Sequence, residues 1–242
     1  MIWTFEEDQK LKELYYDNMK IKDIAKELAK SPNQIKVRKS KLGYIDRDRK
    51  TAYRAHLPNY LNDIEEQIIY GSLLGDAFVT LQKKKEFNFR ECHSIKQLDY
   101  IQWKCNLLKR WDAKLCIQPK YKRVALYTPY HDIWQQINSE TYQNGRKTIT
   151  VEWLEKIDYL GLAALIGDDG TRHGNGCRIA TNCFNGEEND LIVNIFSDKF
   201  GVKFQKNYRP SVGYFYVFIP AEAYRALLKK LPVPKGIEYK FI

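Results

Sequence analysis

Two aspartates and two lysines recur at matching intervals along this 242-residue chain, and their side chains suit phosphate chemistry. Asp76 and Asp169 are 93 residues apart, and so are Lys147 and Lys240. Carboxylates can hold a divalent cation, and an ammonium group can stabilise negative charge that develops on a phosphate. The spacing predicts an internal duplication with one aspartate and one lysine in each half.

A short apolar segment with small residues at helical spacing precedes each aspartate. Gly71 and Gly75 are four apart in GSLLGDA, and Ala163 and Gly167 are four apart in LAALIGDDG. Small residues at this spacing share one helix face and let two helices approach closely. The helices would then end together and bring the two aspartates side by side at helix C-termini, which is unfavourable for two anions. A divalent cation such as Mg²⁺ removes that penalty and can activate water against a phosphodiester.

Alternating segments, typical of strands, follow each of these helices. In the first half we expect strands over 78–82 and 86–92, a helix over 98–111, and strands over 116–121 and 123–127. In the second half we expect a turn over 172–176, a strand over 177–184, a helix over 188–200, and strands over 202–208 and 213–219. Each half closes with another helix and a lysine, so the halves should pack as a pseudo-dimer.

The two motifs and their separation resemble those of single-chain LAGLIDADG homing endonucleases. The similarity covers roughly residues 64–242 and includes the closing EYKF segment. It implies an α+β fold, a pseudo-twofold pair of αββαββα units whose antiparallel sheets form a saddle over DNA. Repeat one would span about 64–150 and repeat two about 151–242. The resemblance also implies a monomer that cuts both strands of a long, asymmetric double-stranded DNA site.

The same resemblance assigns roles to particular residues. The metal-binding acids of the family fall on Asp76 and Asp169, with Mg²⁺ or Mn²⁺ as the cofactor. Asp168 falls where the family usually has a small residue, so we treat it as a neighbour rather than a ligand. The active-site lysines of the family fall on Lys147 and Lys240. All four matched residues are therefore expected to be catalytic.

Polar and apolar side chains alternate in several of the expected strands, and the polar face is expected to lie in a DNA major groove. Basic residues at the turns would add contacts to phosphates or bases. The candidate DNA contacts in the two repeats are Asn88, Arg90, Lys120, Lys122, Arg123, Arg178, Lys203, Gln205, Asn207 and Arg209. An ordinary amphipathic sheet with a solvated polar face is the alternative.

Residues 1–43 are predicted to form a separate domain of three helices, joined to the repeats by a linker over 44–63. Thr4 and Ser31 are suited to cap the first and third helices, and Pro32 suits the first position of the third. The segment resembles a Myb-like helix-turn-helix in Trp3, the IKDIAKEL helix and the closing KLG. The third helix would then offer DNA the side chains of Asn33, Gln34, Lys36, Arg38 and Lys39. A helical cap with a solvated basic face is the alternative.

The composition agrees with a polyanionic partner and excludes several classes of protein. The chain carries 40 Lys+Arg against 30 Asp+Glu, a formal net charge of +10. Its five cysteines include no CxxC pair, which argues against a disulfide framework and a structural zinc site. The apolar stretches are shorter than the roughly 20 residues of a membrane helix, and no signal segment is visible. We therefore expect an intracellular protein without a membrane partner.

Two other functions stay open at this stage. The same fold serves RNA maturases that assist intron splicing, which would need the basic surface and intron RNA but not the two acids. A non-catalytic DNA-binding regulator led by the helix-turn-helix is the other alternative. The paired acids favour the endonuclease, acting in intron homing.

Overall fold

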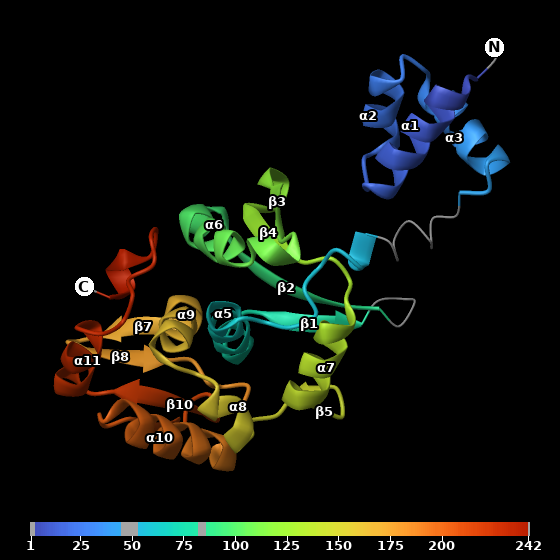
Figure 1. The fold of residues 1–242 in the computed structure, drawn as a ribbon. Coiled ribbons are helices and arrows are strands. Elements are labelled where there is room, and N and C mark those ends of the chain that lie inside the picture. The colour runs from blue at the N-terminus through green and yellow to red at the C-terminus, as the bar shows by residue number, and fades with distance from the viewer. Residues whose placement is uncertain (1–2, 45–52, 82–85, 242) are drawn as a thin grey trace. The chain divides into compact units, whose positions relative to one another are not determined.

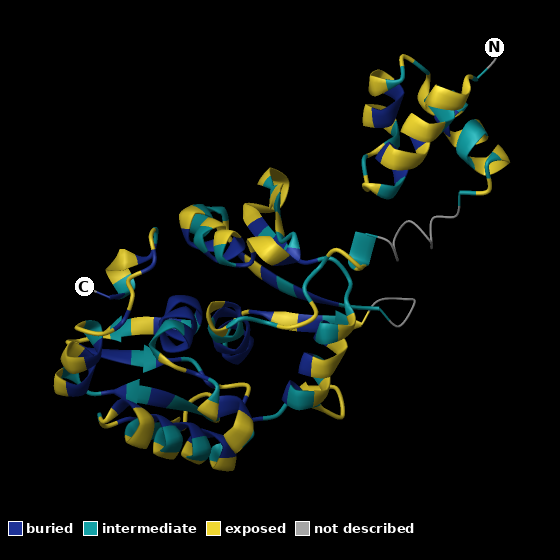
Figure 2. Cartoon of the chain, viewed as in Figure 1, coloured by how far each residue is buried: buried dark blue, intermediate teal, exposed yellow. Residues whose placement is uncertain are grey.

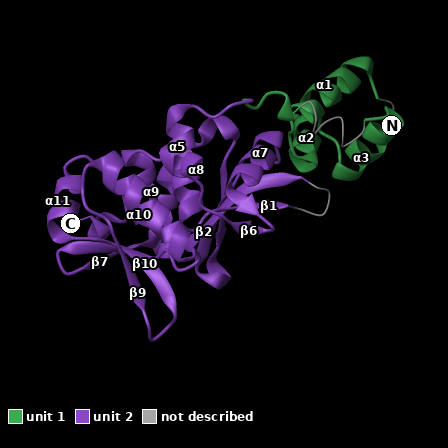
Figure 3. Cartoon of the chain, turned by 90° about the horizontal axis from the view of Figure 1, so that it is seen from below, with its two compact units in different colours: residues 1–58 green, residues 59–242 purple. Residues whose placement is uncertain are grey.

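The computed structural model describes residues 3–44, 53–81 and 86–241, in two compact units (Figure 3). The units are Met1–Pro58 and Asn59–Ile242, so their boundary falls inside the expected linker. Part of that linker, 45–52, and the segment 82–85, where the strand expected over 78–82 ends and the chain leads to the next one, lie outside the described residues. None of the helices in the described part of the chain is both long enough and apolar enough to cross a membrane.

The first unit is a bundle of three helices with a core of its own. It contains α1 (Phe5–Tyr16), α2 (Ile21–Glu27) and α3 (Pro32–Lys41). Thr4 and Ser31 accept from backbone amides at the starts of α1 and α3, in capping boxes, as the sequence predicts. The buried side chains of the three helices, among them Tyr15 and Ile35, meet in the centre. The three expected helices are thus confirmed, whereas the likeness to a Myb-like helix-turn-helix stays a prediction.

The second unit contains two repeats that share the order helix, two strands, helix, two strands, helix, to which the first repeat adds two short strands at its end and the second adds a short helix at its start. The first repeat consists of α5 (Asp63–Leu74), β1 (Phe78–Leu81), β2 (Phe87–Ser94), α6 (Leu98–Leu107), β3 (Lys114–Gln118), β4 (Arg123–Tyr127), α7 (Asp132–Thr141), β5 (Tyr142–Gln143) and β6 (Arg146–Lys147). The second consists of α8 (Val151–Glu155), α9 (Tyr159–Asp169), β7 (Gly170–His173), β8 (Gly176–Ile179), α10 (Gly186–Phe200), β9 (Gln205–Arg209), β10 (Tyr214–Ile219) and α11 (Ala221–Leu228). The short 3-10 helices are η1 (Ile95–Gln97), η2 (Lys109–Trp111), η3 (Pro119–Tyr121) and η4 (Glu238–Lys240).

Two antiparallel sheets of matching topology flank a central pair of helices. Their strand orders are β1-β2-β4-β3 and β7-β8-β10-β9. Helices α5 and α9 lie side by side between the sheets (Figure 1) and are almost entirely buried (Figure 2). Helices α6 and α7 pack on the first sheet, and α10 and α11 pack on the second. The predicted α+β fold with two related repeats is confirmed.

The pairing of the strands gives the equivalence of residues between the repeats. Phe78, two residues after Asp76, pairs with Arg90 across β1 and β2. Thr171, two residues after Asp169, pairs with Arg178 across β7 and β8. Arg90 and Arg178 are therefore equivalent positions on the central strands, 88 residues apart. Helices α6 and α10 keep the same interval, because their N-cap residues are Gln97 and Asn185.

The structure corrects several of the expected elements. The strand expected over 116–121 is β3, which ends at Gln118 and is followed by η3, and the strand expected over 202–208 is β9, which begins at Gln205. The turn predicted over 172–176 is much shorter, because β7 continues to His173 and the chain reverses at Gly174, whose φ is +58°. The strand predicted over 177–184 ends at Ile179, since a backbone hydrogen bond closes a turn between Thr181 and Phe184. The helix predicted over 98–111 is α6, which ends at Leu107 and is followed by η2.

Candidate active site

Helices α5 and α9 approach each other through glycines. A Cβ atom added to Gly71 would lie 2.3 Å from the carbonyl oxygen of Gly161, and one added to Gly75 would lie 2.6 Å from Cβ of Asp168. Small residues therefore permit the close contact, as predicted. Gly167 was expected on this contact face, and that expectation is wrong: the position for its Cβ faces a side chain of α6, because α9 contacts α5 through Gly161 and Asp168 instead.

The two predicted acids lie at the same end of this helix pair. Asp169 is the last residue of α9, and Asp76 follows the C-cap residue of α5. The Asp76 side chain is 44% exposed, whereas Asp169 is half-buried. Burial, together with the charge of Asp76, raises the pKa of Asp169 to about 6. Such a shift is expected where two carboxylates share one site.

Each predicted lysine reaches the C-terminal end of the motif helix in its own repeat. Lys147 Nζ donates to the carbonyl oxygen of Gly75 at 2.9 Å. Lys240 Nζ donates to the carbonyl oxygens of Gly167 and Asp168 at 2.6 and 3.0 Å. Gly75 and Asp168 are 93 residues apart, the same interval as the lysines, so the two contacts are equivalent. Burial lowers the pKa of both ammonium groups, and the charges of the nearby aspartates oppose that effect.

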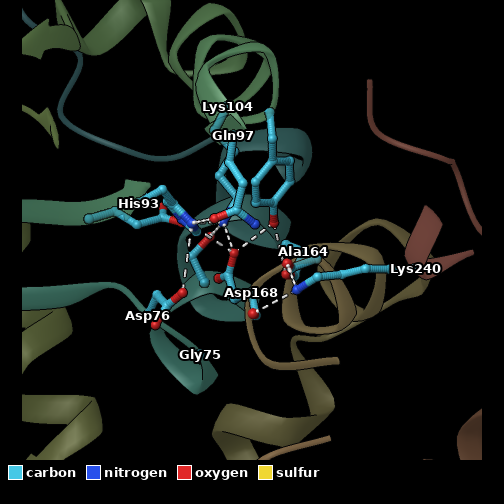
Figure 4. A network of polar contacts seen from close by, with 12 residues as sticks. Gly75, Asp76, His93, Gln97, Lys104, Ala164, Asp168 and Lys240 are labelled. Carbon is cyan, nitrogen blue, oxygen red and sulfur yellow. Dashed lines mark hydrogen bonds and ion pairs between the residues drawn. The ribbon is translucent and has the colours of Figure 1, made fainter. Parts of the chain in front are cut away.

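Asp168 belongs to a buried polar network with α6 and β2 (Figure 4). Its Oδ1 accepts from Lys104 Nζ and from the Tyr100 hydroxyl, both at 2.7 Å. Lys104 also donates to Glu91 Oε1 at 2.5 Å, and the same oxygen lies 2.5 Å from His93 Nε2. The network joins the two repeats, because Asp168 comes from the second repeat and its partners come from the first.

Two buried carboxylates face one buried ammonium group in this network. Burial and the neighbouring charge of Glu91 raise the pKa of Asp168, while Lys104 opposes the shift. Burial also disfavours the ionised form of Glu91, but Lys104 and His93 outweigh it and lower the pKa of Glu91. At His93, burial lowers the pKa of the imidazole, but the hydrogen bond to Glu91 and the charges of Glu91 and Asp168 together outweigh burial and raise it. One oxygen of each carboxylate, Oδ2 of Asp168 and Oε2 of Glu91, has no hydrogen-bond partner within the described residues.

Sequence reasoning missed the part of this network that the first repeat supplies. A signal was present in β2, where Phe89, Glu91 and His93 alternate and are all buried. Ionisable residues at the inward positions of a strand indicate a buried polar site rather than a solvated face. The predicted strand stopped at residue 92, so His93 was not included. Lys104 and Tyr100 likewise lie one helical turn apart on the buried face of α6.

Most of the candidate DNA contacts lie on the sheet faces away from the helices or at strand turns. Arg90 and Arg178 are half-buried at equivalent positions of β2 and β8. The exposed basic side chains around the turn between β3 and β4 are Lys120, Lys122 and Arg123. These positions are compatible with phosphate or base contacts, and their role stays a prediction.

Strand β9 carries an alternating polar row. Gln205, Asn207 and Arg209 point to one face, because the intervening Lys206 turns to the other and pairs with Asp190 of α10 at 2.5 Å. In the partner strand β10, the register places aromatic residues opposite all three. Polar and aromatic groups thus share the face that has been predicted to meet DNA.

Two candidate contacts lie elsewhere. Asn88 is 2% exposed, and its amide donates to the Thr128 carbonyl oxygen at 3.2 Å. The prediction that this side chain faces DNA is wrong, because the amide is held inside the fold by a backbone acceptor. Lys203 is exposed but precedes β9, which begins at Gln205, so it lies outside the alternating row.

In the first unit, some of the α3 side chains that were predicted to contact DNA instead make contacts within the three-helix bundle. Gln34 Oε1 accepts from the N-cap amide of α3 at 2.7 Å. Arg38 forms an ion pair with Asp8 of α1, and Lys39 donates to the Tyr15 hydroxyl at 3.0 Å. The exposed members of the predicted set are Asn33 and Lys36.

The chain belongs to the LAGLIDADG DNA endonuclease family, whose family model matches residues 66–227. The matched segment contains most of α5, all of α9 and the strands of both sheets. It confirms the family that the two motifs predict. The homing endonuclease I-WcaI, in a structure bound to its DNA recognition sequence, shares the fold: the TM-score is 0.71 at 18% identity, over 84% of this chain and 97% of that chain.

Two kinds of curated relative match the chain. The RecA protein of Mycolicibacterium chitae is 30% identical over 115 residues, which is 47% of this chain and 27% of the RecA protein. The chain therefore spans about a quarter of the length of such relatives. The cytochrome b mRNA maturase bI2 of Debaryomyces hansenii is 22% identical over 208 residues, which is 77% of this chain and 78% of the maturase.

Proposed function

We propose that this protein is a site-specific double-strand DNA endonuclease that hydrolyses phosphodiesters with divalent metal held by Asp76 and Asp169. The observation that carries the proposal is the meeting of these two acids at one end of the α5–α9 pair. The two lysines reach the same helix ends through equivalent contacts. Each half of the chain thus contributes one acid and one ammonium group, so a monomer suffices to act on both strands.

The residues at this end fit Mg²⁺ or Mn²⁺. Both ions prefer oxygen ligands, and Asp76 is open to solvent, phosphate and metal. Burial and the charge of Asp76 raise the pKa of Asp169 by more than Lys147 and Lys240 lower it, so a bound cation would favour the ionised form. A bound divalent ion would supply a water of lowered pKa and stabilise the leaving oxygen of the phosphodiester. Asp76 and Asp169 would orient that ion between the repeats.

Lys147 and Lys240 have two roles in the proposal. Their hydrogen bonds to helix-terminal carbonyl oxygens fix the ammonium groups beside the acids. Because burial lowers the pKa of each ammonium, each is a better hydrogen-bond donor to an attacking water or a phosphate oxygen than a solvated lysine. The two equivalent lysines would serve the two strands.

The open faces of the two sheets would read the target. Arg90, Arg178 and the polar row of β9 are the residues best placed to contact base edges or phosphates. The three-helix unit would add contacts through Asn33 and Lys36, and a second tethered module raises the effective concentration of the first on DNA. Since the substrate is genomic DNA, we infer an intracellular location.

The test uses the full-length protein and a plasmid library that carries random target sequences. We expect Mg²⁺-dependent cleavage of a subset of the library. On a selected target, Asp76→Asn and Asp169→Asn should each abolish double-strand cleavage while DNA binding persists. Asp198→Asn, on the exposed face of α10, is the matched control and should cleave normally.

Unchanged cleavage by either active-site variant would remove that aspartate from the mechanism. If neither the wild type nor any variant cuts DNA, the endonuclease proposal is lost.

The maturase relative favours a second candidate function, assistance in the splicing of intron RNA, since the match covers 77% of this chain. A maturase needs the basic surface but not the two acids. Binding to the chain's own putative intron RNA in preference to duplex DNA, unaffected by Asp169→Asn, would favour this second function.

A further inference from the structure

His93 lies beside the proposed catalytic acids and takes no part in the function proposed above. A ring nitrogen of His93 and one carboxylate oxygen each from Asp76 and Asp168 lie within 4.8 Å of one another (Figure 4). His93 and Asp168 have fully or almost fully buried side chains, while that of Asp76 is open to solvent. The cluster therefore has two buried side chains on its interior side and is open to solvent at Asp76.

The imidazole of His93 is oriented as it is in metal sites. Its Nε2 lies 2.5 Å from Glu91 Oε1, where an Nε2–H group donates to the carboxylate. Nδ1 is the nitrogen that faces Asp76, 3.7 Å from its Oδ2, and in the neutral ring it carries the lone pair that an ion would take. A carboxylate behind one nitrogen with the other nitrogen facing the ion is the usual support for a ligating histidine. Nδ1 also lies 3.3 Å from Gln97 Oε1, so this amide must turn away before Nδ1 faces an ion.

Asp168 gives an independent sign that this cluster suits a cation. Its Oδ1 accepts from Lys104 and Tyr100, but its Oδ2 is buried with no hydrogen-bond partner among the described residues. A buried carboxylate oxygen without a donor or cation is costly. The network also holds two carboxylates against one ammonium group. A cation at Oδ2 would correct both deficits.

We propose that Asp76, His93 and Asp168 bind a divalent transition-metal ion at the first-repeat end of the active site, in addition to the metal held by Asp76 and Asp169. The mixed nitrogen and oxygen ligands favour Mn²⁺, Co²⁺ or Zn²⁺ over Mg²⁺, which prefers oxygen. In repeat two the position equivalent to His93 is Thr181, 88 residues later. The nitrogen ligand is therefore a property of the first repeat. The proposal rests on the proposed function only in that Asp76 serves both sites.

The experiment is Mn²⁺ electron spin echo spectroscopy on the full-length protein without DNA. We expect nitrogen modulation from ¹⁴N in the wild type, and a changed pattern when its histidines carry ¹⁵N. His93→Gln should lose the modulation and bind Zn²⁺ at least tenfold more weakly by calorimetry. His173→Gln, an exposed histidine of β7, is the matched control and should behave as wild type.

Asp169→Asn separates this proposal from the endonuclease. It should abolish cleavage but keep the nitrogen modulation, because Asp169 is not a ligand of the proposed site. Mn²⁺ that binds the wild type without any nitrogen coupling would overturn the His93 site, whatever the cleavage assay shows. The isotope measurement needs no variant, so misfolding of His93→Gln would not leave the question undecided.

Discussion

The two repeats share one topology but fill equivalent interior positions with opposite chemistry. With the 88-residue interval of the central strands and following helices, Glu91 and Lys104 correspond to Ile179 and Ile192. The first pair is a buried ion pair at 2.5 Å, and the second pair is part of the hydrophobic core. The same backbone arrangement thus accepts either a salt bridge or two isoleucines.

The difference originates in the motif helices. Asp168 corresponds to Gly75. Helix α9 therefore places a buried carboxylate against the first repeat, whereas α5 has only a glycine, without a side chain, at the equivalent position. A buried carboxylate requires a counter-charge and donors. Repeat one supplies them through Lys104 and Tyr100, whereas repeat two has no such carboxylate to accommodate and packs apolar side chains. One residue of asymmetry therefore accounts for a whole network.

The largest expected effect comes from removing the counter-charge. Lys104→Met leaves Asp168 and Glu91 buried without their ammonium partner and should lower the free energy of unfolding by about 3–5 kcal/mol. The equivalent change in the second repeat, Ile192→Met, exchanges apolar groups and should cost less than about 1.5 kcal/mol. Urea denaturation of both variants at pH 7.5 measures the contrast. Equal losses would mean that the ion pair is not what distinguishes the repeats.

Lys147 and Lys240, at the ends of the motif helices, should contribute equally to cleavage, although the interior residues of the two repeats differ. Because their contacts are equivalent, Lys147→Met and Lys240→Met should each slow cleavage of a target by about 100-fold. Rates of plasmid nicking and linearisation report the two strands separately. Lys229→Met, an exposed lysine after α11, is the control and should match the wild type. A large effect from one lysine alone would show that the asymmetry extends to catalysis.

Patterns that repeat in the sequence were predictable, and the unrepeated features were not. The strand β4, the capped helices and the equal spacing of Asp76, Asp169 and the two lysines follow from local periodicity and from the duplication. The network around Asp168 joins residues 64 to 77 positions apart, and no local pattern connects them. Asn88 was assigned to the wrong environment because alternation identifies a face of a strand but not what covers it.

The pKa of Asp169 predicts how stability depends on pH in the absence of metal. The carboxyl group has an ordinary pKa of 3.8 and a folded-state pKa of about 6, so between these values the folded state binds more protons than the unfolded state. The stabilisation is present in full below about pH 4 and is lost as the pH rises through 6. In EDTA, wild type should lose about 1–2 kcal/mol over this window relative to Asp169→Asn, after allowance for solvent screening. Denaturation of both proteins at pH 4.5 and 7.5 measures this loss. If the wild type instead gains stability relative to Asp169→Asn as the pH rises, the assigned pKa shift is wrong.

The smallest effect is expected when the network of repeat one is replaced as a whole by the chemistry of repeat two. The triple variant Glu91→Ile, Lys104→Ile and Asp168→Ala removes both carboxylates together with their ammonium partner, although His93 loses Glu91 as the acceptor of its Nε2–H. Tyr100 keeps an acceptor, since its hydroxyl also donates to the Ala164 carbonyl oxygen at 3.0 Å.

Replacing a buried ionic cluster by apolar residues is often nearly neutral, so the triple variant should lie within about 1.5 kcal/mol of the wild type. Each single variant should lose more than the triple, and the sum of the three single losses should exceed the triple loss by several kcal/mol in denaturation. Additive losses would show that the three residues act independently, and the repeats would then differ for a reason other than the buried carboxylate of Asp168.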